Sequence, residues 1–367
     1  MQLARVALEV LEVPFRAPLE TAAGTWRSRR LGLVRLGSIT GHEGVGEVAV
    51  DRPAGIDRLD GLDEATLVRS LEGLDVTDAA ALEGRLGAID TSPRMGRPLR
   101  SAVESGVLDL LARTSGVSVA QRLGERPHDS VRVNAFIGLD DPARVAQQAR
   151  QHVSNGFSCL KLKGTDEPIE LMVQRLAAVR AAVGPGPRLR VDFNGSLSRA
   201  TAARALVAMA PFDLEYAEQP IAAGAGVEAW SRLRRTSPVA LAADESVDGV
   251  ESAERLLAAG AVDVMVLKPA RVGGLRTAAR IARMAADAGV RTVVSTMFES
   301  GLGVAGALHL AVSLPGDQAH GLATLDLLLD DLLVEPLVVV DGRMSLPRGP
   351  GLGVELDAAA LERRRLR

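Results

Sequence analysis

The stretch "SCLKLKGTDEPIELMVQRLAAVRAAVGPGPRLRVDFNG", residues 158–195, contains a strand pattern, a helix pattern and a second strand pattern. Short apolar runs open and close it, and an amphipathic, alanine-rich segment lies between them. The first run sets Lys161 and Lys163 one residue apart, so both side chains point to the same face of the expected strand. Two like charges side by side in an apolar strand repel each other, and the rest of the chain must explain why they are there.

The same strand and helix rhythm recurs along most of the chain. Short apolar runs alternate with alanine-rich helix patterns at a repeat of about 25 to 30 residues. Eight strands that alternate with helices predict an α/β fold, a (β/α)₈-type barrel. The expected strands are residues 131–138, 159–164, 188–195, 214–220, 239–246, 263–269, 291–300 and 321–326.

The two ends of the chain follow a different pattern. Residues 1–50 alternate apolar and polar side chains between glycines, which is typical of antiparallel hairpins, and residues 63–113 change to the period of helices. The tail returns to strands and turns and is expected to rejoin this unit. We therefore predict an α+β domain formed by residues 1–115 with the tail 335–367, and a barrel domain formed by residues 116–334.

Composition narrows the possible partners. The formal net charge is −3 and the 43 basic residues are scattered, which argues against nucleic acid or an anionic membrane as the partner. No run reaches the roughly 18 apolar residues of a spanning helix, and the N-terminus lacks a signal-peptide pattern. The single cysteine, Cys159, cannot form an internal disulfide. We expect a cytoplasmic protein with a small-molecule partner, and a homo-oligomer remains open.

Charged side chains end five consecutive strands of the predicted barrel. Because the loops that follow barrel strands build the functional mouth, these ends are the candidate site. Asp192, Glu218, Asp244 and Lys268 are separated by 26, 26 and 24 residues, one repeat each, so the three carboxylates should converge. Converging carboxylates need a cation, and hard oxygen ligands suit Mg²⁺, with Mn²⁺ as the alternative. The charged or polar strand-end residues are Lys161, Lys163, Asp192, Asn194, Glu218, Asp244, Glu245 and Lys268.

Each of these residues has a simpler interpretation when it is taken alone. Asp192 or Asp244 could cap a helix, and Glu218 could be a loop residue. Lys268, however, has the same strand parity as Val264 and Val266, so it should point into the barrel. Buried charge is costly unless it is paired or functional, and the whole set therefore indicates a site.

The set suits removal of a proton next to a carboxylate. The α-proton of a carboxylate anion is weakly acidic, so a cation must stabilise the enediolate that forms. A lysine base must also be neutral near pH 7, and a second ammonium beside it disfavours its charged form. The repulsion between Lys161 and Lys163 is then a means of preparing one of them as the base.

The ordered motifs "KLK", "VDFNG", "EQP", "ADES" and "LKP" resemble the muconate-cycloisomerase branch of the enolase superfamily over essentially the whole chain. The resemblance implies an α+β capping domain over a (β/α)₇β barrel. It also implies Mg²⁺ on Asp192, Glu218 and Asp244, and lysine acid/base residues on the second and sixth strands. The mandelate-type histidine base has no counterpart, and His320 is expected to be structural.

Four stretches most resemble o-succinylbenzoate synthases: "TAAGTWRSRRLGLVRL", "GEVAV", "STMFESGLGVAGALHLA" and "HGLATLDLLLDDL". The resemblance implies loss of water from a cyclohexadiene carboxylate, a lyase step of menaquinone biosynthesis. Lys163 would be the base, Lys161 would tune it, and Lys268 would face the opposite side of the substrate. Asn194 and Glu245 would orient metal ligands. Ser300 and Gly301 would bind the succinyl carboxylate, and Thr25 and Trp26 would close over it.

Three alternatives remain open. The same site could racemise an N-succinyl or N-acyl amino acid, because Lys163 and Lys268 would flank the substrate. It could also act as a cycloisomerase on a muconate-like diacid. Outside enzymes, a non-catalytic barrel could use the lysines to bind an anionic ligand.

Overall fold

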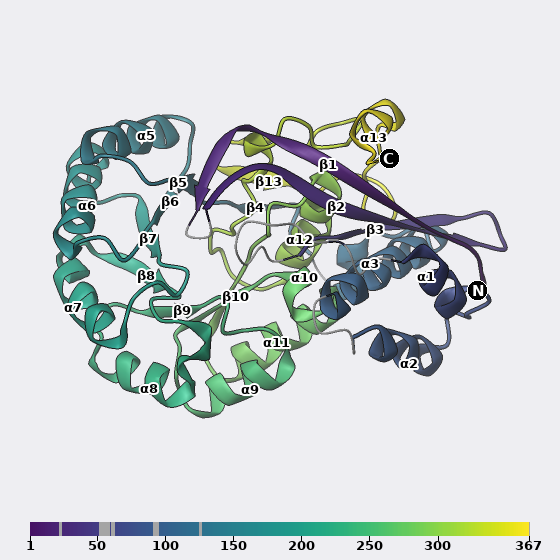
Figure 1. Ribbon diagram of the computed structural model, residues 1–367, viewed down its shortest axis with the longest axis horizontal. Coiled ribbons are helices and arrows are strands. Elements are labelled where there is room, and N and C mark those ends of the chain that lie inside the picture. Colours follow the sequence, from purple (N-terminus) through teal and green to yellow (C-terminus); the bar gives the residue numbers. More distant parts are fainter. Residues whose placement is uncertain (22–23, 51–58, 60–62, 91–94, 125–126, 367) are drawn as a thin grey trace.

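The computed structural model describes residues 1–21, 24–50, 59, 63–90, 95–124 and 127–366. Figure 1 shows a curled sheet with helices on its outer side, and beside it a second part built on a long hairpin. The sheet has seven parallel strands in sequence order. They are β5 (Ala135–Ile137), β6 (Cys159–Lys163), β7 (Arg188–Asp192), β8 (Leu214–Glu218), β9 (Leu241–Ala243), β10 (Val264–Leu267) and β11 (Arg291–Val294).

A helix follows each strand, as the repeat predicts. These helices are α5 (Pro142–Ser154), α6 (Ile169–Val183), α7 (Arg199–Met209), α8 (Val227–Thr236), α9 (Val250–Ala258), the short α10 (Pro269–Val272) with α11 (Leu275–Asp287), and α12 (Gly301–Ser313). Local chemistry sets their starts: Asp141 accepts hydrogen bonds from the first free N–H groups of α5, and Pro142 occupies its first position. Leu160 and Leu162 of β6 are buried in the core that these helices cover.

The prediction of a regular eighth strand was wrong. Residues 321–326 form no regular strand, and two single parallel bridges close the barrel instead. Gly321 bridges to Ser295 after β11, and His320 bridges to Val133 just before β5. His320 is buried, its Nδ1 accepts a hydrogen bond from the Val294 N–H at 2.9 Å, and burial lowers its pKa to about 3. A buried neutral ring with a backbone partner is a structural histidine.

The N-terminal part is the predicted α+β unit. Strands β1 (Leu3–Thr21), β2 (Gly24–Ser38) and β3 (Glu43–Val48) form an antiparallel sheet. Helices α1 (Glu64–Leu71), α2 (Ala79–Asp90) and α3 (Gly96–Thr114) accompany it, and α3 packs on β3. Gly44 and Gly46 allow this approach, since a Cβ at Gly46 would lie 1.9 Å from the Ala102 carbonyl oxygen. Helix α4 (Val119–Leu123) leads into the barrel.

The C-terminal tail divides between the two parts. Strand β13 (Arg343–Ser345) pairs with β4 (Ser130–Arg132), just before the first barrel strand, and with β12 (Val339–Val340), an arrangement that the sequence did not predict. Helix α13 (Ala358–Arg364) packs on β1, so the end of the chain does rejoin the N-terminal sheet. The predicted boundaries near residues 115 and 335 stay a prediction.

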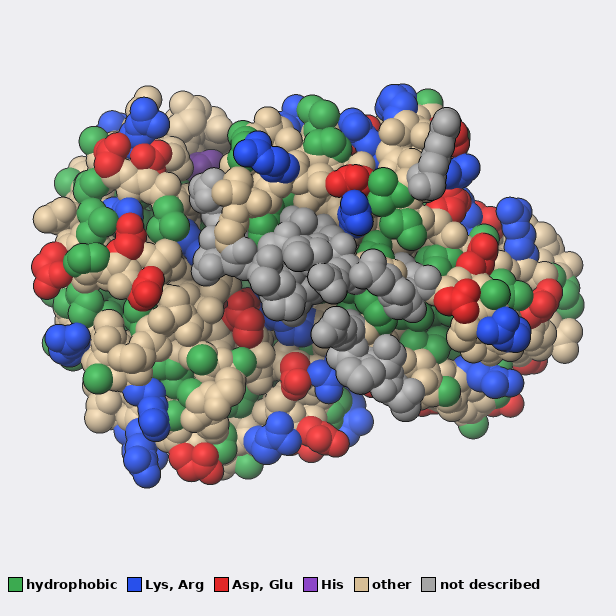
Figure 2. Space-filling view, viewed as in Figure 1, with side chains coloured by type: hydrophobic (Ala, Val, Ile, Leu, Met, Phe, Trp, Pro, Cys, Tyr) green, Lys and Arg blue, Asp and Glu red, His purple; other side chains and the backbone are tan. Residues whose placement is uncertain are grey.

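Two further features of the molecule are the distribution of charge on its surface and the length and apolar character of its helices. Figure 2 shows acidic and basic side chains interspersed over the displayed face rather than gathered in a patch of one sign. Among the residues that the structure describes, no helix has the length and apolar character needed to cross a membrane.

A charged network fills the inside of the barrel below the strand ends. Arg190 of β7 is fully buried; it pairs with Glu215 at 2.7 Å and donates to Asn134 Oδ1 at 3.1 Å and to the Ala319 carbonyl at 2.9 Å. Its guanidinium lies 4.6 Å from the centre of the Tyr216 ring. Arg190 thus joins β7 to β8 and to the two loops that carry Asn134 and Ala319.

Arg190→Met should therefore destabilise the barrel. Removal of Arg190 leaves Glu215 only the more exposed partners Arg188 and Arg291, each at 3.2 Å, and it also takes the donor from the Ala319 carbonyl. We expect a loss of about 3 kcal/mol in the free energy of unfolding. Urea unfolding followed by circular dichroism measures it. The matched control is Arg144→Met, because the Arg144 side chain is 71% exposed. Equal stabilities of the two variants would contradict this role.

Candidate functional site

Sheet register places the predicted base and two predicted metal ligands in one row. Lys163 of β6 lies beside Asp192 of β7, and Asp192 lies beside Glu218 of β8. Each residue is the last of its strand, so the row runs along the carboxyl edge of the sheet. All three are buried, with exposed fractions of 8%, 6% and 1%. The one-repeat spacing in the sequence thus becomes direct adjacency.

Lys161 lies two residues deeper on β6 and bridges the two carboxylates. Its Nζ is 2.7 Å from Glu218 Oε1 and 3.1 Å from Asp192 Oδ2. Burial works against its charge, but the Asp192 and Glu218 carboxylates prevail and raise the pKa of Lys161 well above its usual value. Lys161 is therefore a fixed cation beside Lys163. Its effect on the base stays a prediction.

The third carboxylate, Asp244, follows β9 and is fully buried. Lys268 Nζ donates to its Oδ2 at 2.6 Å, and the Arg271 guanidinium donates to its Oδ1. Burial alone would raise the pKa of Asp244, but Arg271 and Lys268 outweigh it and hold the pKa below its usual range. Lys268 thus points into the site, as its strand parity predicts.

Asn194, Glu245 and Gln219 join the loops after three neighbouring strands. Asn194 donates from Nδ2 to Glu245 Oε1 at 2.8 Å and from its backbone to Asp192 Oδ1 at 3.0 Å. Gln219 Oε1 accepts from the backbone N–H of Asp244 at 2.9 Å. Asn194 and Gln219 both have positive φ, 44° and 40°, an uncommon conformation that tends to occur at functional sites.

The acidic oxygens of the site fit a divalent cation. Glu218 Oε2 and Glu245 Oε2 are buried, and no described residue gives either of them a hydrogen bond. Burial, reinforced by Asp192 and Asp244, raises the pKa of Glu218 to about 7 although Lys161 opposes this. Hard oxygen donors with an unpaired buried atom are what Mg²⁺ binds. Asp192, Glu218 and Asp244 would hold it.

The three carboxylates are spread along the edge of the sheet rather than gathered at one point. In the described part of the chain, no three His, Cys, Asp or Glu side chains are grouped as a set of ligands. Two ammonium groups contact these carboxylates: Lys161 Nζ lies between Asp192 and Glu218, and Lys268 Nζ pairs with Asp244. Metal binding at this set therefore stays a prediction.

Lysine is confined to this site. The sequence contains only three lysines, Lys161, Lys163 and Lys268, and every other basic residue of the 43 is arginine. Arginine cannot be deprotonated in proteins, whereas lysine can act as a base. Lys163 is also the lysine for which the described residues provide no hydrogen bond or ion pair. Its amine is the one available to take a proton.

Ser300 and Gly301, predicted to bind a substrate carboxylate, contact protein acceptors instead. Ser300 caps α12, and its hydroxyl and its N–H both donate to the carboxylate of Glu47 from β3, the N–H at 3.0 Å. The Gly301 N–H donates to the Asp331 carbonyl at 2.8 Å. Burial raises the pKa of Glu47 to about 7. Substrate contact by either residue would require these bonds to exchange, and it stays a prediction.

Trp26 brings the hairpin to the loop after β11. Its ring meets Phe298 edge-on at 5.8 Å between ring centres, and Phe15 meets the same Phe298 ring edge-on at 5.9 Å. Phe298 has a φ of 62°, which is strained for a bulky residue. Thr25, next to Trp26, is exposed. The hairpin thus reaches the loop that carries Ser300, while closure over a substrate stays a prediction.

Sequence reasoning missed three residues of this site. Gln219 stands inside the quoted motif "EQP", and its position directly after Glu218 could have drawn attention to it. Arg271 lies three residues after Lys268, the spacing of one helical turn. Glu47 contacts a residue 253 positions away, and no local pattern predicts such a contact.

Comparisons with known proteins agree with this geometry. A family model described as "Enolase C-terminal domain-like" matches residues 144–360. An N-succinylamino acid racemase of Thermus thermophilus is 32% identical and covers 99% of this chain and 97% of its own length. An o-succinylbenzoate synthase of Thermobifida fusca is 38% identical over 64% of this chain and 74% of its own.

A solved structure supports the same relationship across the whole fold. The muconate lactonizing enzyme from Pseudomonas fluorescens, complexed with muconolactone, superposes with a TM-score of 0.91 and is 28% identical. The match covers 100% of this chain and 99% of the other. Sequence family, full-length relatives and backbone geometry agree, and the chain belongs to the enolase superfamily.

Proposed function

We propose that this enzyme is an o-succinylbenzoate synthase, a lyase that removes water from a cyclohexadiene carboxylate in menaquinone biosynthesis. The observation that carries the proposal is that every lysine of the chain lies beside three buried carboxylates at one edge of the sheet. The site provides fixed cations, Lys161 and Lys268, for a carboxylate substrate, and one amine, that of Lys163, which forms no ion pair with any described residue. The identity of 38% to the Thermobifida fusca synthase favours this reaction.

Lys163 would perform both proton transfers. Its neutral amine takes the α-proton, the C–H electron pair forms a double bond between the α-carbon and the carboxylate carbon, and the C=O π pair moves onto a carboxylate oxygen. When that pair returns, the resulting ammonium protonates the departing hydroxyl. The C–O bond breaks as the ring double bond forms, and water leaves with the transferred proton. Base and acid are the same group, so proton and hydroxyl leave from the same side. Lys268, across the substrate, would stabilise the negative charge of the intermediate.

The metal would be held by Asp192, Glu218 and Asp244. A bound Mg²⁺ or Mn²⁺ supplies positive charge that stabilises the enediolate form of the substrate carboxylate. Asn194 keeps Asp192 and Glu245 in place from its backbone and side chain. Gln219 holds Asp244 in place, because its Oε1 accepts a hydrogen bond from the Asp244 backbone N–H.

A racemase acting on N-succinyl amino acids is the second candidate. The Thermus thermophilus relative carries that name and matches 99% of this chain. The same lysines support it chemically if Lys163 and Lys268 exchange protons on opposite faces of one α-carbon. A muconate-type cycloisomerase is a third possibility, favoured by the similarity to the Pseudomonas fluorescens lactonizing enzyme.

Incubation in D₂O distinguishes these reactions. The Mg²⁺-loaded enzyme is given the cyclohexadiene substrate, N-succinyl amino acids and a muconate in separate reactions. We expect rapid dehydration, with little deuterium at Cα of the amino acids, measured by absorbance and proton NMR. Exchange at Cα with little dehydration would favour the racemase instead, and lactone formation would favour the cycloisomerase. No turnover of any substrate by Mg²⁺-bound enzyme would contradict the proposal.

A further inference from the structure

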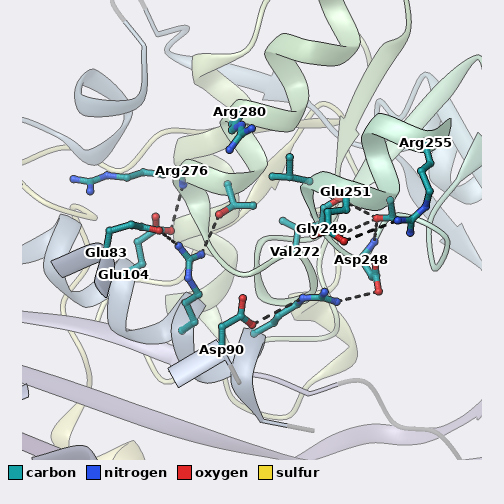
Figure 3. Close-up of a pocket in the computed structure, with 15 residues that line it drawn as sticks. Glu83, Asp90, Glu104, Asp248, Gly249, Glu251, Arg255, Val272, Arg276 and Arg280 are labelled. Atoms are coloured by element: carbon teal, nitrogen blue, oxygen red, sulfur yellow. Dashed lines mark hydrogen bonds and ion pairs between the residues drawn. The ribbon is translucent and has the colours of Figure 1, made fainter. Parts of the chain in front are cut away.

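A cavity of about 500 Å³ separates the capping part from the barrel (Figure 3). Helices α2 and α3 line one side, and α9, α10 and α11 line the other. Its lining is mainly charged side chains of both signs, unlike the mostly apolar lining of small-molecule sites. Several of them pair across the cavity, as Arg97 does with Asp248 at 3.0 Å. The two walls therefore hold each other in place.

Two residues of α3 contact the corner between α10 and α11. Arg100 and Glu104 are four residues apart, so they share one helix face. Arg100 Nη1 donates to the Gly273 carbonyl at 2.8 Å and to Thr277 Oγ1 at 3.2 Å. Figure 3 shows Glu104 joined to Arg276, whose N–H donates to Glu104 Oε2 at 3.3 Å. Both side chains are largely buried.

These contacts complete a turn that could not be stable alone. Helix α10 has only four residues, far below the length at which isolated helices form. Its end exposes carbonyl groups that need partners, and Arg100 satisfies that of Gly273. The next helix, α11, begins without a side-chain cap of its own, and Glu104 accepts one of its first N–H groups.

Glycine makes this close approach possible. Gly273 and Gly274 have φ of 96° and 137°, values that side chains rarely allow. A Cβ on Gly274 would lie 1.8 Å from Glu104 Oε2. The corner is therefore shaped to receive the two side chains of α3.

Lys268 belongs to the same hydrogen-bonded turn. It is the N-cap of α10, and its carbonyl accepts from the N–H groups of Arg271 at 2.9 Å and Val272 at 3.1 Å. Any shift of the corner therefore moves the backbone of Lys268. Lys163 is held differently, because it lies within the sheet register beside Asp192, whereas Lys268 is one residue beyond the last registered pair of β10, Leu267 with Val294.

We propose that Arg100 is a positioning residue that sets the place of Lys268 from the capping domain. Glu104 supports it by fixing the start of α11. The inference rests on the proposed function in one respect: Lys268 must act on the substrate for the shift to affect turnover. Lys163 does not depend on Arg100.

Lysine NMR tests the inference independently of turnover. Because the chain has three lysines, full-length protein labelled with ¹³Cε-lysine gives three side-chain signals, which single Lys→Arg variants assign. In Arg100→Met, the Lys268 signal should shift or broaden while those of Lys161 and Lys163 keep their positions. The control is Arg280→Met, an exposed arginine of the same cavity that pairs with Glu254 at 3.7 Å. An unchanged Lys268 signal, or equal changes in all three, would overturn the inference.

Steady-state kinetics of Arg100 variants provide a second test of the inference. We expect Arg100→Met to lower kcat about 10- to 100-fold with KM nearly unchanged, as for a group displaced by about 1 Å. Arg100→Lys, which keeps charge and a single donor, should be intermediate and serves if the methionine variant fails to fold. In a Lys268→Ala background the Arg100 effect should vanish. Its persistence there would overturn the inference, whereas wild-type inactivity would count only against the proposed function.

Discussion

Lys163→Ala should reduce kcat by about 10²- to 10⁴-fold, the usual contribution of a positioned general base. Lys163 is the lysine of the site that no carboxylate among the described residues binds, and it ends its strand directly beside Asp192. Steady-state dehydration by the Mg²⁺-loaded variant measures the loss. Substrate binding, followed by titration calorimetry, should weaken far less than turnover.

Lys163→Arg is the matched variant for this prediction. Arginine keeps the positive charge but cannot give up its proton near neutral pH, so this variant should be about as inactive as Lys163→Ala. Substantial activity in Lys163→Arg would show that only charge is needed there. A parent protein without turnover, whose ligand affinity falls with each lost charge, would instead indicate the non-catalytic anion-binding barrel.

Removal of the metal is expected to have an effect of similar size. A metal that stabilises several kcal/mol of developing charge corresponds to a loss of about 10³-fold or more in rate when it is chelated. Activity should return with Mg²⁺ or Mn²⁺. Glu218→Gln should prevent this recovery, because it removes a buried carboxylate whose Oε2 has no hydrogen-bond partner in the described part of the chain.

Binding provides a readout of the metal that does not depend on activity. Mg²⁺ should raise the melting temperature of the wild-type protein in proportion to the logarithm of its concentration and should leave that of Glu218→Gln unchanged. Glu251→Gln is the control, since the Glu251 side chain is 91% exposed. A chelated enzyme with full activity, or equal stabilisation of Glu218→Gln, would refute the assigned ligands.

Regular spacing made the centre of the site predictable. One βα unit occupies a nearly constant length, so residues one repeat apart become neighbours at the strand ends. Asp192 and Glu218 demonstrate this, because a spacing of 26 residues becomes direct register across β7 and β8. Lys268 was predictable for a related reason, since side chains alternate along a strand.

Contacts between distant segments were not predictable in this way. The prediction of a regular eighth strand was wrong because residues 320 and 321 form only single bridges, to Val133 and Ser295. Single bridges leave no periodic pattern in the sequence. The hydrogen bonds that the hydroxyl and N–H of Ser300 donate to Glu47, 253 residues earlier in the chain, were not predictable either, and its role in substrate binding stays a prediction. Such partners depend on how the capping part sits on the barrel.

Lys161 and Lys163 show what the sequence determines and what only the tertiary structure decides. The sequence alone determined that Lys161 and Lys163 share one face of a strand and that three carboxylates end the neighbouring strands, because both follow from local periodicity. Only the tertiary structure decided that Lys161 is held between Asp192 and Glu218 while Lys163 is not. Only it showed that Arg100 reaches the turn of Lys268 from 173 residues away. Side-chain direction follows from the chain itself, whereas the choice of partner depends on which surfaces packing brings together.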